Sequence, residues 1–246
     1  MALPATDTFT TDISQTLTSY SSNWTMAQGV MRVDAGEDTV GGYVDQDESC
    51  AYWNADSFSA DQYSQVTIAG YRTGYGAFGV AVRASSGTYY GLYTDSSDTY
   101  LFKYVSNTWI QIGPTGAKVN NGSILRLEVS GASSNTTLTP KTDGSVSDIG
   151  QQTGRNDGIG SGSAGLAGWD NEYLNTCATD WEGGNLSSTT TYTRTVTNVA
   201  AALKWLRLRS VASAVASLSY RIGRPEADIT TGSWGSTPLW DKVDDP

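Results

Sequence analysis

The stretch that decides the fold is GAFGVAVRASSGTYYGLYTDSSDTYLFKYVSNTWIQIG, residues 76–113. Apolar and aromatic residues recur at every second position, which is the pattern of a strand with one buried face. Polar turn formers interrupt the pattern at residues 85–87, 95–98 and 107. The stretch therefore predicts an antiparallel meander of three or four short strands.

The first strand of this stretch divides its residues between two faces. Phe78, Val80 and Val82 form the set that faces a core. Arg83 belongs to the alternate set, which faces solvent or a groove. Similar alternation recurs on both sides of the stretch, at residues 62–72 and 123–131. Because a helical period is almost absent, we expect an all-β fold with two antiparallel sheets.

Composition excludes several classes of function. The chain has 246 residues, a net charge of −10 and no histidine. Ser-His-Asp and Cys-His hydrolysis are excluded, as are zinc, haem and non-haem iron sites that need histidine. The acidity argues against nucleic-acid binding over most of the chain. What remains is a β-rich binding or structural module, or an enzyme that works through carboxylates or tyrosine.

No targeting signal stands out in the sequence. A run of about 18 apolar residues, which a membrane helix needs, does not occur, so no membrane partner is expected. The N-terminal residues MALPATDTFTTD lack the charged and apolar regions of a secretory signal peptide. We expect a protein that acts where it is made or leaves the cell by another route, such as a virus particle.

The charge pattern changes after residue 186. Residues 187–225 contain six basic residues and no acidic ones, and an acidic tail follows. We therefore expect a sandwich domain over 1–186, and a basic β-strand extension with an acidic tail over 187–246. The interpretation we favour is that the basic segment docks on the acidic sandwich. The alternative is a contact surface for a negatively charged neighbour protein.

The order of these motifs resembles a known superfamily. The run from Arg83 to Gly113, then NGSILRLEVSG at 121–131 and GSAGLAG at 162–168 before DWEGG at 180–184, resembles the concanavalin A-like (laminin-G-like) jelly-roll superfamily. The resemblance covers about residues 5–186. It implies a two-sheet antiparallel jelly-roll sandwich. The sequence is most similar to modules of bacteriophage or environmental-virus structural proteins, which implies a virion or extracellular location.

The resemblance also implies carbohydrate binding, on the concave sheet or at its rim, commonly with calcium nearby. Sugars need flat aromatic faces for their C–H surfaces and planar polar groups for their hydroxyls. The candidate ligand-binding residues are Arg83, Tyr71, Tyr90, Tyr100 and Trp109. The alternative is that these tyrosines only fill sheet faces and cross-strand pairs.

No metal ligand can be assigned from the sequence. The stretch 34–48 is rich in Asp and Glu, whose oxygens suit calcium, but its spacing matches no EF-hand loop. We favour a solvated acidic loop, so we predict no cofactor and leave calcium open. Cys50 and Cys177 lie in no metal-binding or redox motif. They are either two buried thiols or one disulfide.

Catalysis finds little support in the sequence. Asp170 and Glu172, and likewise Asp180 and Glu182, have the two-residue spacing that places carboxylates on one face of a strand. The resemblance implies that a hydrolase of this fold would carry a Glu-x-Asp-x-Glu strand, which is absent here. Lyases of this fold use a histidine, which is also absent. We therefore predict no catalytic residue and no enzyme.

These observations predict a non-enzymatic virion structural, decoration or receptor-binding module with glycan contact. Its partners would be other virion or capsid proteins, or cell-surface glycans, and assembly into a homo-oligomer stays open. One alternative is a free lectin or carbohydrate-binding module. The other is an atypical glycoside hydrolase.

Overall fold

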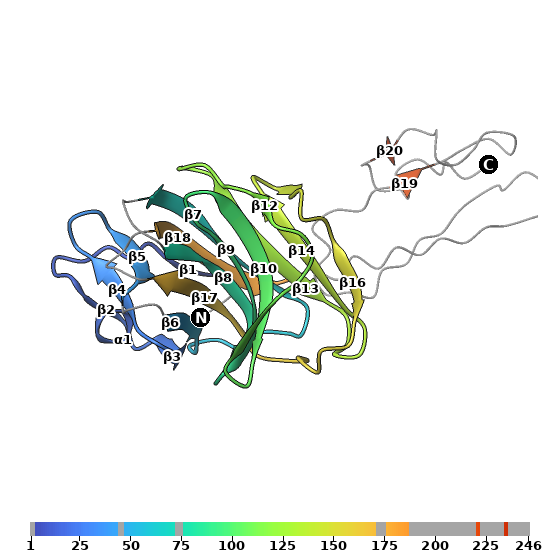
Figure 1. Cartoon of the computed structure of the whole chain (residues 1–246), viewed down its shortest axis with the longest axis horizontal. Coiled ribbons are helices and arrows are strands. Elements are labelled where there is room, and N and C mark those ends of the chain that lie inside the picture. Colours follow the sequence, from blue (N-terminus) through green and yellow to red (C-terminus); the bar gives the residue numbers. More distant parts are fainter. Residues whose placement is uncertain are drawn as a thin grey trace, which may run out of the picture. The chain divides into compact units, whose positions relative to one another are not determined.

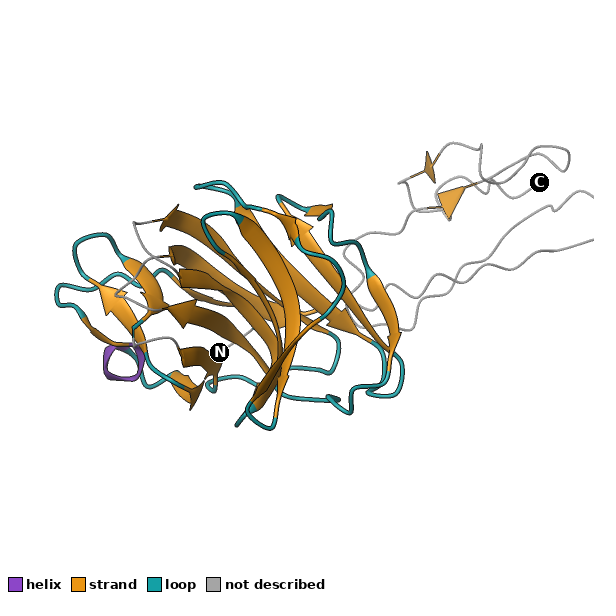
Figure 2. Cartoon of the chain, in the orientation of Figure 1, coloured by secondary structure: helices purple, strands orange, loops and turns teal. Residues whose placement is uncertain are grey.

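The computed structural model of this protein describes residues 3–43, 47–71, 76–170, 176–186, 220–221 and 234–235. The chain divides into two units, Met1–Ser188 and Thr189–Pro246. The first is a sandwich of two antiparallel sheets, so the predicted all-β class is confirmed (Figures 1 and 2). Its described part contains one short helix, α1 (Leu17–Tyr20), at the same end as β2, β3 and β4.

Sheet A has ten strands in the order β15-β14-β13-β7-β18-β5-β4-β2, with β1 paired to β18 and β16 paired to β14. Its strands are β1 (Ala5–Asp7), β2 (Gln15–Thr16), β4 (Met31–Asp34), β5 (Thr39–Gly42), β7 (Gln62–Tyr71), β13 (Ile124–Ser130), β14 (Thr136–Thr142), β15 (Ser145–Val146), β16 (Gln152–Arg155) and β18 (Thr176–Asn185). The central pair, β7 and β18, joins a strand from the first third of the chain to the last strand of the sandwich.

Sheet B has eight strands in the order β11-β10-β9-β8-β17-β6-β3, with β12 paired to β10. Its strands are β3 (Trp24–Gln28), β6 (Asp47–Trp53), β8 (Gly76–Ser85), β9 (Thr88–Thr94), β10 (Asp98–Val105), β11 (Thr108–Gln111), β12 (Gly116–Ala117) and β17 (Ser163–Asp170). Strands β8 to β11 are neighbours in chain order, so the predicted meander is confirmed.

The core between the sheets follows the predicted alternation. Phe78, Val80 and Val82 of β8 are buried in one cluster with Leu125 and Leu127 of β13. Burying each such side chain contributes about 1.5–3 kcal/mol. The residues between them in the sequence face the other side of each sheet. Both outer faces are therefore free to carry different chemistry.

Three tryptophans meet in this core. Trp24 lies 4.7 Å from Trp181 between ring centroids, and Trp53 lies 5.2 Å from each of the other two. A buried indole needs a partner for its N–H group. The three N–H groups donate at 2.8–2.9 Å to Asp7, Asp56 and Ser64. The triad thus fills the core without leaving an indole donor unpaired.

Most of the second unit lies outside the described residues, including the greater part of the basic segment 187–225. Two short strands of this unit are described, β19 (Tyr220–Arg221) and β20 (Trp234–Gly235), and they pair antiparallel. Within the described residues, no helix is long and apolar enough to cross a membrane.

The two cysteines lie on different sheets. Cys50 is on β6 of sheet B and Cys177 on β18 of sheet A, and both are buried thiols outside any disulfide. The interpretation of two buried thiols is confirmed, and a disulfide between them is not formed.

Candidate functional site

Sheet B carries a second cluster of side chains on the side turned away from the intersheet core. Tyr89 and Tyr93 of β9 and Phe102 and Tyr104 of β10 are buried there, separately from the main core. Partly buried rings surround them, from Tyr52, Tyr100, Trp109 and Trp169. We call this surface, with its buried layer and its partly exposed rim, the aromatic face.

Small residues make room for these rings. The central strands β8 and β17 contribute Ala77, Ala81 and Ala167 to the cluster. A Cβ at Gly91 would lie 2.2 Å from the ring of Phe102, so only glycine lets that ring lie flat on β9. The rings stack on one another, with Tyr89 and Tyr104 centroids 5.3 Å apart at 15°. The small residues of the central strands and the large rings of the neighbouring strands together give sheet B a closely packed aromatic face.

Two hydrogen bonds cross this face between strands on opposite sides of it. Gln28 Nε2 on β3 donates to the Tyr104 hydroxyl on β10 at 2.5 Å. The Tyr93 hydroxyl on β9 donates to Glu48 Oε1 on β6 at 3.5 Å, a long contact. In each pair the two strands are not neighbours in the sheet. Sheet B must therefore curl strongly, with the aromatic face on its concave side.

Three buried side-chain oxygens on this face have no hydrogen-bond partner among the residues that the structure describes. They are Gln28 Oε1, Glu48 Oε2 and Tyr89 Oη. Buried polar atoms in native proteins are nearly always paired, because leaving one unpaired costs about 1–3 kcal/mol. Their gathering on one aromatic surface marks it as a candidate site.

The buried layer of the aromatic face favours neutral forms of its titratable groups. Burial raises the pKa of Glu48 to about 8, and the long contact with Tyr93 opposes this only in part. Burial also raises the pKa of Tyr89, Tyr93 and Cys50 well above their ordinary values. Negative charge lies at the rim, where Asp95 and Asp98 accept from the Tyr100 hydroxyl. The face can stack apolar surface and form neutral hydrogen bonds.

The structure brings together two of the five predicted ligand residues. Tyr100 and Trp109 are part of the rim of the aromatic face, where Trp109 stacks on Phe102 at 5.6 Å. Tyr90 lies on the opposite side of β9, buried in the intersheet core, with its hydroxyl donating to Asp157. Tyr71 packs against that same core. Tyr71 and Tyr90 therefore do not share a surface with the other two.

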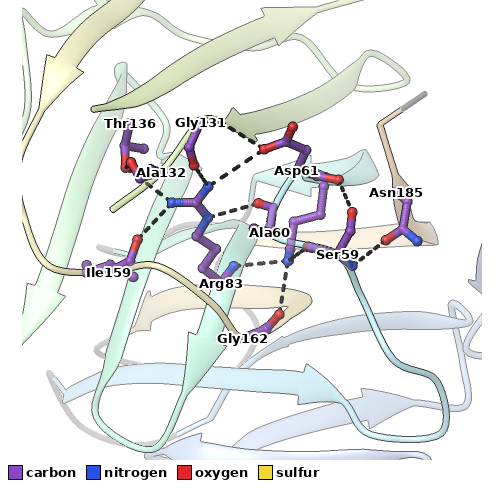
Figure 3. A network of polar contacts seen from close by, with 11 residues as sticks. Ser59, Ala60, Asp61, Arg83, Gly131, Ala132, Thr136, Ile159, Gly162 and Asn185 are labelled. Carbon is purple, nitrogen blue, oxygen red and sulfur yellow. Dashed lines mark hydrogen bonds and ion pairs between the residues drawn. The ribbon is translucent and has the colours of Figure 1, made fainter. Parts of the chain in front are cut away.

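The prediction that Arg83 lines a groove is wrong. The pairing of β8 with β9 shifts register between Val82 and Ser85, and Arg83 has a φ of 50° there. A bulge of this kind re-aims the side chain and breaks the two-residue alternation. The Arg83 side chain is fully buried in a network of polar contacts, out of reach of a ligand (Figure 3).

The Arg83 guanidinium joins four segments of the sandwich instead. It donates to the carbonyls of Ala60 at 2.9 Å, Ile159 at 2.8 Å and Gly131, and to the hydroxyl of Thr136 at 3.1 Å. Asp61, 3.9 Å away, is its nearest opposite charge and is half exposed. Arg83 is therefore a structural anchor.

Asp180 and Glu182 line one open cavity of sheet A, but the strand between them does not have the regular geometry that the spacing argument requires. The pairing of β18 with β7 shifts register between Thr179 and Glu182, and Asp180 has a φ of 50°. The two-residue alternation assumed for Asp180 and Glu182 is therefore broken. The side chains of Asp170 and Glu172 lie outside the described residues, as does part of the acidic stretch 34–48. Among described residues, no three metal-binding side chains cluster.

Sequence reasoning misses Glu48 and Tyr89, although one signal was present for Tyr89. Tyr90 has the same parity as Leu92, an apolar residue of the same strand, so Tyr90 belongs to the core side and Tyr89 to the other side. Nothing local marks Glu48 among its acidic neighbours. Its burial depends on pairing with β17, where Trp169 lies opposite it.

The outer face of sheet A has two open cavities of about 410 and 480 Å³. Tyr63, Arg126 and Glu182 line them. The Tyr63 hydroxyl donates to Glu182 at 2.5 Å, and Arg126 stacks 3.6 Å from the Tyr63 ring centroid. These polar groups are thus paired with one another, unlike the oxygens of the aromatic face.

Comparisons with known proteins add the following. No protein-family model matches the sequence, and no curated protein matches it. Among solved structures, the carbohydrate binding module CBM66 from Bacillus subtilis has 18% identity and a TM-score of 0.44, over 64% of this chain and 91% of that one. The Emp46p carbohydrate recognition domain has 12% identity and a TM-score of 0.46, over 68% and 90%. A galectin-like-fold protein of unknown function from Bacillus subtilis has 9% identity and a TM-score of 0.45, over 68% and 91%.

Proposed function

We propose that the sandwich is a carbohydrate-binding module and that its aromatic face holds the sugar. The observation that carries the proposal is the gathering of three unpartnered oxygens, of Gln28, Glu48 and Tyr89, among stacked rings on one curled sheet. Sugars present apolar C–H faces and neutral hydroxyls, and this surface offers a complement to both. The proposal rests on these residues and not on the similar solved structures.

The partly exposed rim is where a sugar would first make contact. Tyr100 and Trp109 form one side of it, and Tyr52 and Trp169 pack on the same cluster. A ring of this kind contributes stacking area at a low cost in side-chain entropy. The buried layer beneath keeps the rim rings in place, because Trp109 stacks on Phe102.

We further propose that the module is not an enzyme. Hydrolysis of a glycosidic bond needs two carboxyl groups with the bond between them. Among the described side chains at the aromatic face, Glu48 accepts from Tyr93, whereas Asp95 and Asp98 at the rim both accept from the Tyr100 hydroxyl, so these carboxyl groups are engaged in the hydrogen bonds of the face itself. The bulge at Asp180 removes the spacing argument for a pair on sheet A.

The biological setting that we propose is receptor binding on a virion surface, as the sequence resemblance implies. Such a role uses the same face as a free lectin or carbohydrate-binding module, which is the alternative. The partners would be cell-surface glycans on one side and other virion proteins on the other. The virion setting stays a prediction.

A glycan array tests the proposal directly. The full chain should bind a reproducible subset of immobilised oligosaccharides at pH 6, and Trp109→Ala should weaken that binding. A purely structural or decoration protein would bind none of them. Absence of any reproducible sugar binding by a folded sample would overturn the proposed function.

A further inference from the structure

Glu48 has an unusual position on the aromatic face. It lies on β6, directly opposite Trp169 of β17 in the register of the sheet. Its Oε1 receives the long hydrogen bond from Tyr93, at 3.5 Å, and its Oε2 is buried without a partner. One carboxyl oxygen therefore accepts only a weak hydrogen bond, and the other accepts none from the described residues.

The groups around Glu48 do not supply a positive charge. Among described residues, burial and the Tyr93 hydroxyl are what shift the pKa of Glu48, and no cation acts on it. The titratable groups of the cluster are Cys50, Tyr89, Tyr93, Tyr100 and Tyr104, and the carboxyl groups of Asp95 and Asp98 lie at the rim, where they accept from the Tyr100 hydroxyl. The side chains of Asp47 and Asp170, at the strand ends, lie outside the described residues. A carboxylate buried without a cation is costly, so the neutral acid is the stable form.

A neutral carboxylic acid is both a donor and an acceptor. Because Tyr93 donates to Oε1, the proton of the acid belongs on Oε2, the oxygen without a partner. The carboxyl group can turn about χ3 at little cost, because the minima of this torsion are broad. The contact that such a turn breaks, with Tyr93, is a long one. The neutral acid can therefore donate a hydrogen bond to an acceptor on a ligand.

We propose that Glu48 is the specificity-determining residue of the sugar site, donating a hydrogen bond from its neutral acid to an oxygen of an uncharged glycan. This inference rests on the proposed function and deepens it. A sugar that carries a carboxylate would bring a further negative charge to a rim that already holds Asp95 and Asp98, whose carboxyl groups accept from the Tyr100 hydroxyl. Uncharged hexose chains are thus the favoured class, over uronate-containing or sialylated glycans.

The same geometry makes binding dependent on pH. The pKa of Glu48 is about 8, and the thiol and phenol groups around it have pKa values raised above their ordinary ones. At pH 9 only about a tenth of Glu48 keeps its proton, so affinity should fall about tenfold from its value at pH 6. Glu48→Gln keeps a neutral donor at this position and should bind equally at both pH values.

Calorimetric titration with defined sugars tests the inference. The probes are maltohexaose, cellohexaose and mannohexaose as uncharged chains, and trigalacturonate and 3′-sialyllactose as charged ones. Each is titrated at pH 6 and pH 9 into the wild-type chain, Glu48→Gln, Glu48→Ala and the control Glu128→Gln. Glu128 lies on β13 of the other sheet, paired with Arg126 and Lys141.

The outcomes separate the inference from the proposed function. Support requires an uncharged probe whose affinity falls about tenfold at pH 9 in wild type and Glu128→Gln, stays level in Glu48→Gln and is lost in Glu48→Ala. If a sugar binds but Glu48→Gln shows the same pH dependence as wild type, the inference is overturned and the proposed function stands. Tighter binding of the charged probes likewise overturns the inference alone. If no sugar binds at either pH, both fail.

Discussion

Gln28 and Tyr104 meet across the aromatic face, with Gln28 Nε2 2.5 Å from the Tyr104 hydroxyl. Four strands, β9, β8, β17 and β6, separate β10 from β3 in the order of sheet B. A flat sheet would keep these strands roughly 24 Å apart, given five inter-strand spacings of about 4.8 Å. The contact therefore measures how far the sheet curls, and it fixes the width of the surface on which we place the sugar.

We expect Gly91→Ala to destabilise the sandwich by about 2 kcal/mol, because the new methyl group would overlap the Phe102 ring in a packed cluster. The control is Gly70→Ala, where a Cβ would have an ordinary contact with Cys177 Sγ at 3.7 Å. The free energy of unfolding in urea, measured for both, checks this. Equal stabilities for the two variants would show that Phe102 does not rest on β9.

Arg83→Lys should cost about 3 kcal/mol of stability, because one ammonium group cannot reach partners in four segments and would leave buried carbonyls unpaired. Arg126→Lys, on the part-exposed face of sheet A, should cost no more than about 1 kcal/mol. Denaturant unfolding of the two variants gives the comparison. A loss of similar size in both would contradict the structural role assigned to Arg83.

Trp109→Ala should weaken binding of the best array sugar about tenfold, because it removes a rim ring that stacks on Phe102. Tyr71→Phe is the control, since the hydroxyl it removes lies on the core side and donates to the Val119 carbonyl. The dissociation constants of the two variants are compared by calorimetry, and circular dichroism checks that both are folded. A larger loss in Tyr71→Phe than in Trp109→Ala would move the site away from the aromatic face.

Glu48 should also make stability fall with rising pH. Its pKa of about 8 in the folded chain exceeds the ordinary value near 4.5, so the folded state keeps a proton that the unfolded state has lost. Stability from this group is fully present below about pH 4.5 and is lost as the pH rises toward 8, by roughly 2–4 kcal/mol. Unfolding free energies at pH 5 and pH 8 should therefore differ more in wild type than in Glu48→Gln.

Both thiols should resist modification in the native protein. Cys50 and Cys177 are buried thiols that form no disulfide, and burial raises the pKa of the Cys50 thiol. A disulfide-exchange reagent such as Ellman's reagent should label neither at pH 8 and both after unfolding in guanidinium. Labelling of one thiol in the native state would show that its sheet opens locally.

The strands of the sandwich could be predicted from the sequence because their signals are local. The alternation in 76–113 and 123–131 identifies both the strands and the buried set, including Leu125 and Leu127. The turn formers at 85–87 and 95–98 then mark the hairpins. Period-two patterns carry this information because one face is apolar along the whole strand.

The site could be predicted only in part because its decisive features are not local. A bulge adds one residue without changing the composition of a strand, so the alternation places Arg83 on the wrong side. Glu48 is buried by rings from β9 and β17, which are distant in sequence. Tyr100 and Trp109, by contrast, share a parity with no residue of their strands in the intersheet core, and the structure places both at the aromatic face.

The anchor at Arg83 has a consequence for how quickly the domain folds and unfolds. Its four partners lie 23, 48, 53 and 76 residues away in the sequence, so the closures it needs span nearly half of the sandwich. Contacts of such long range form late, after the hairpins of sheet B. Interactions absent from the transition state act on the unfolding rate alone. A single guanidinium would thus set the lifetime of the folded state, while the hairpins set how fast it is reached.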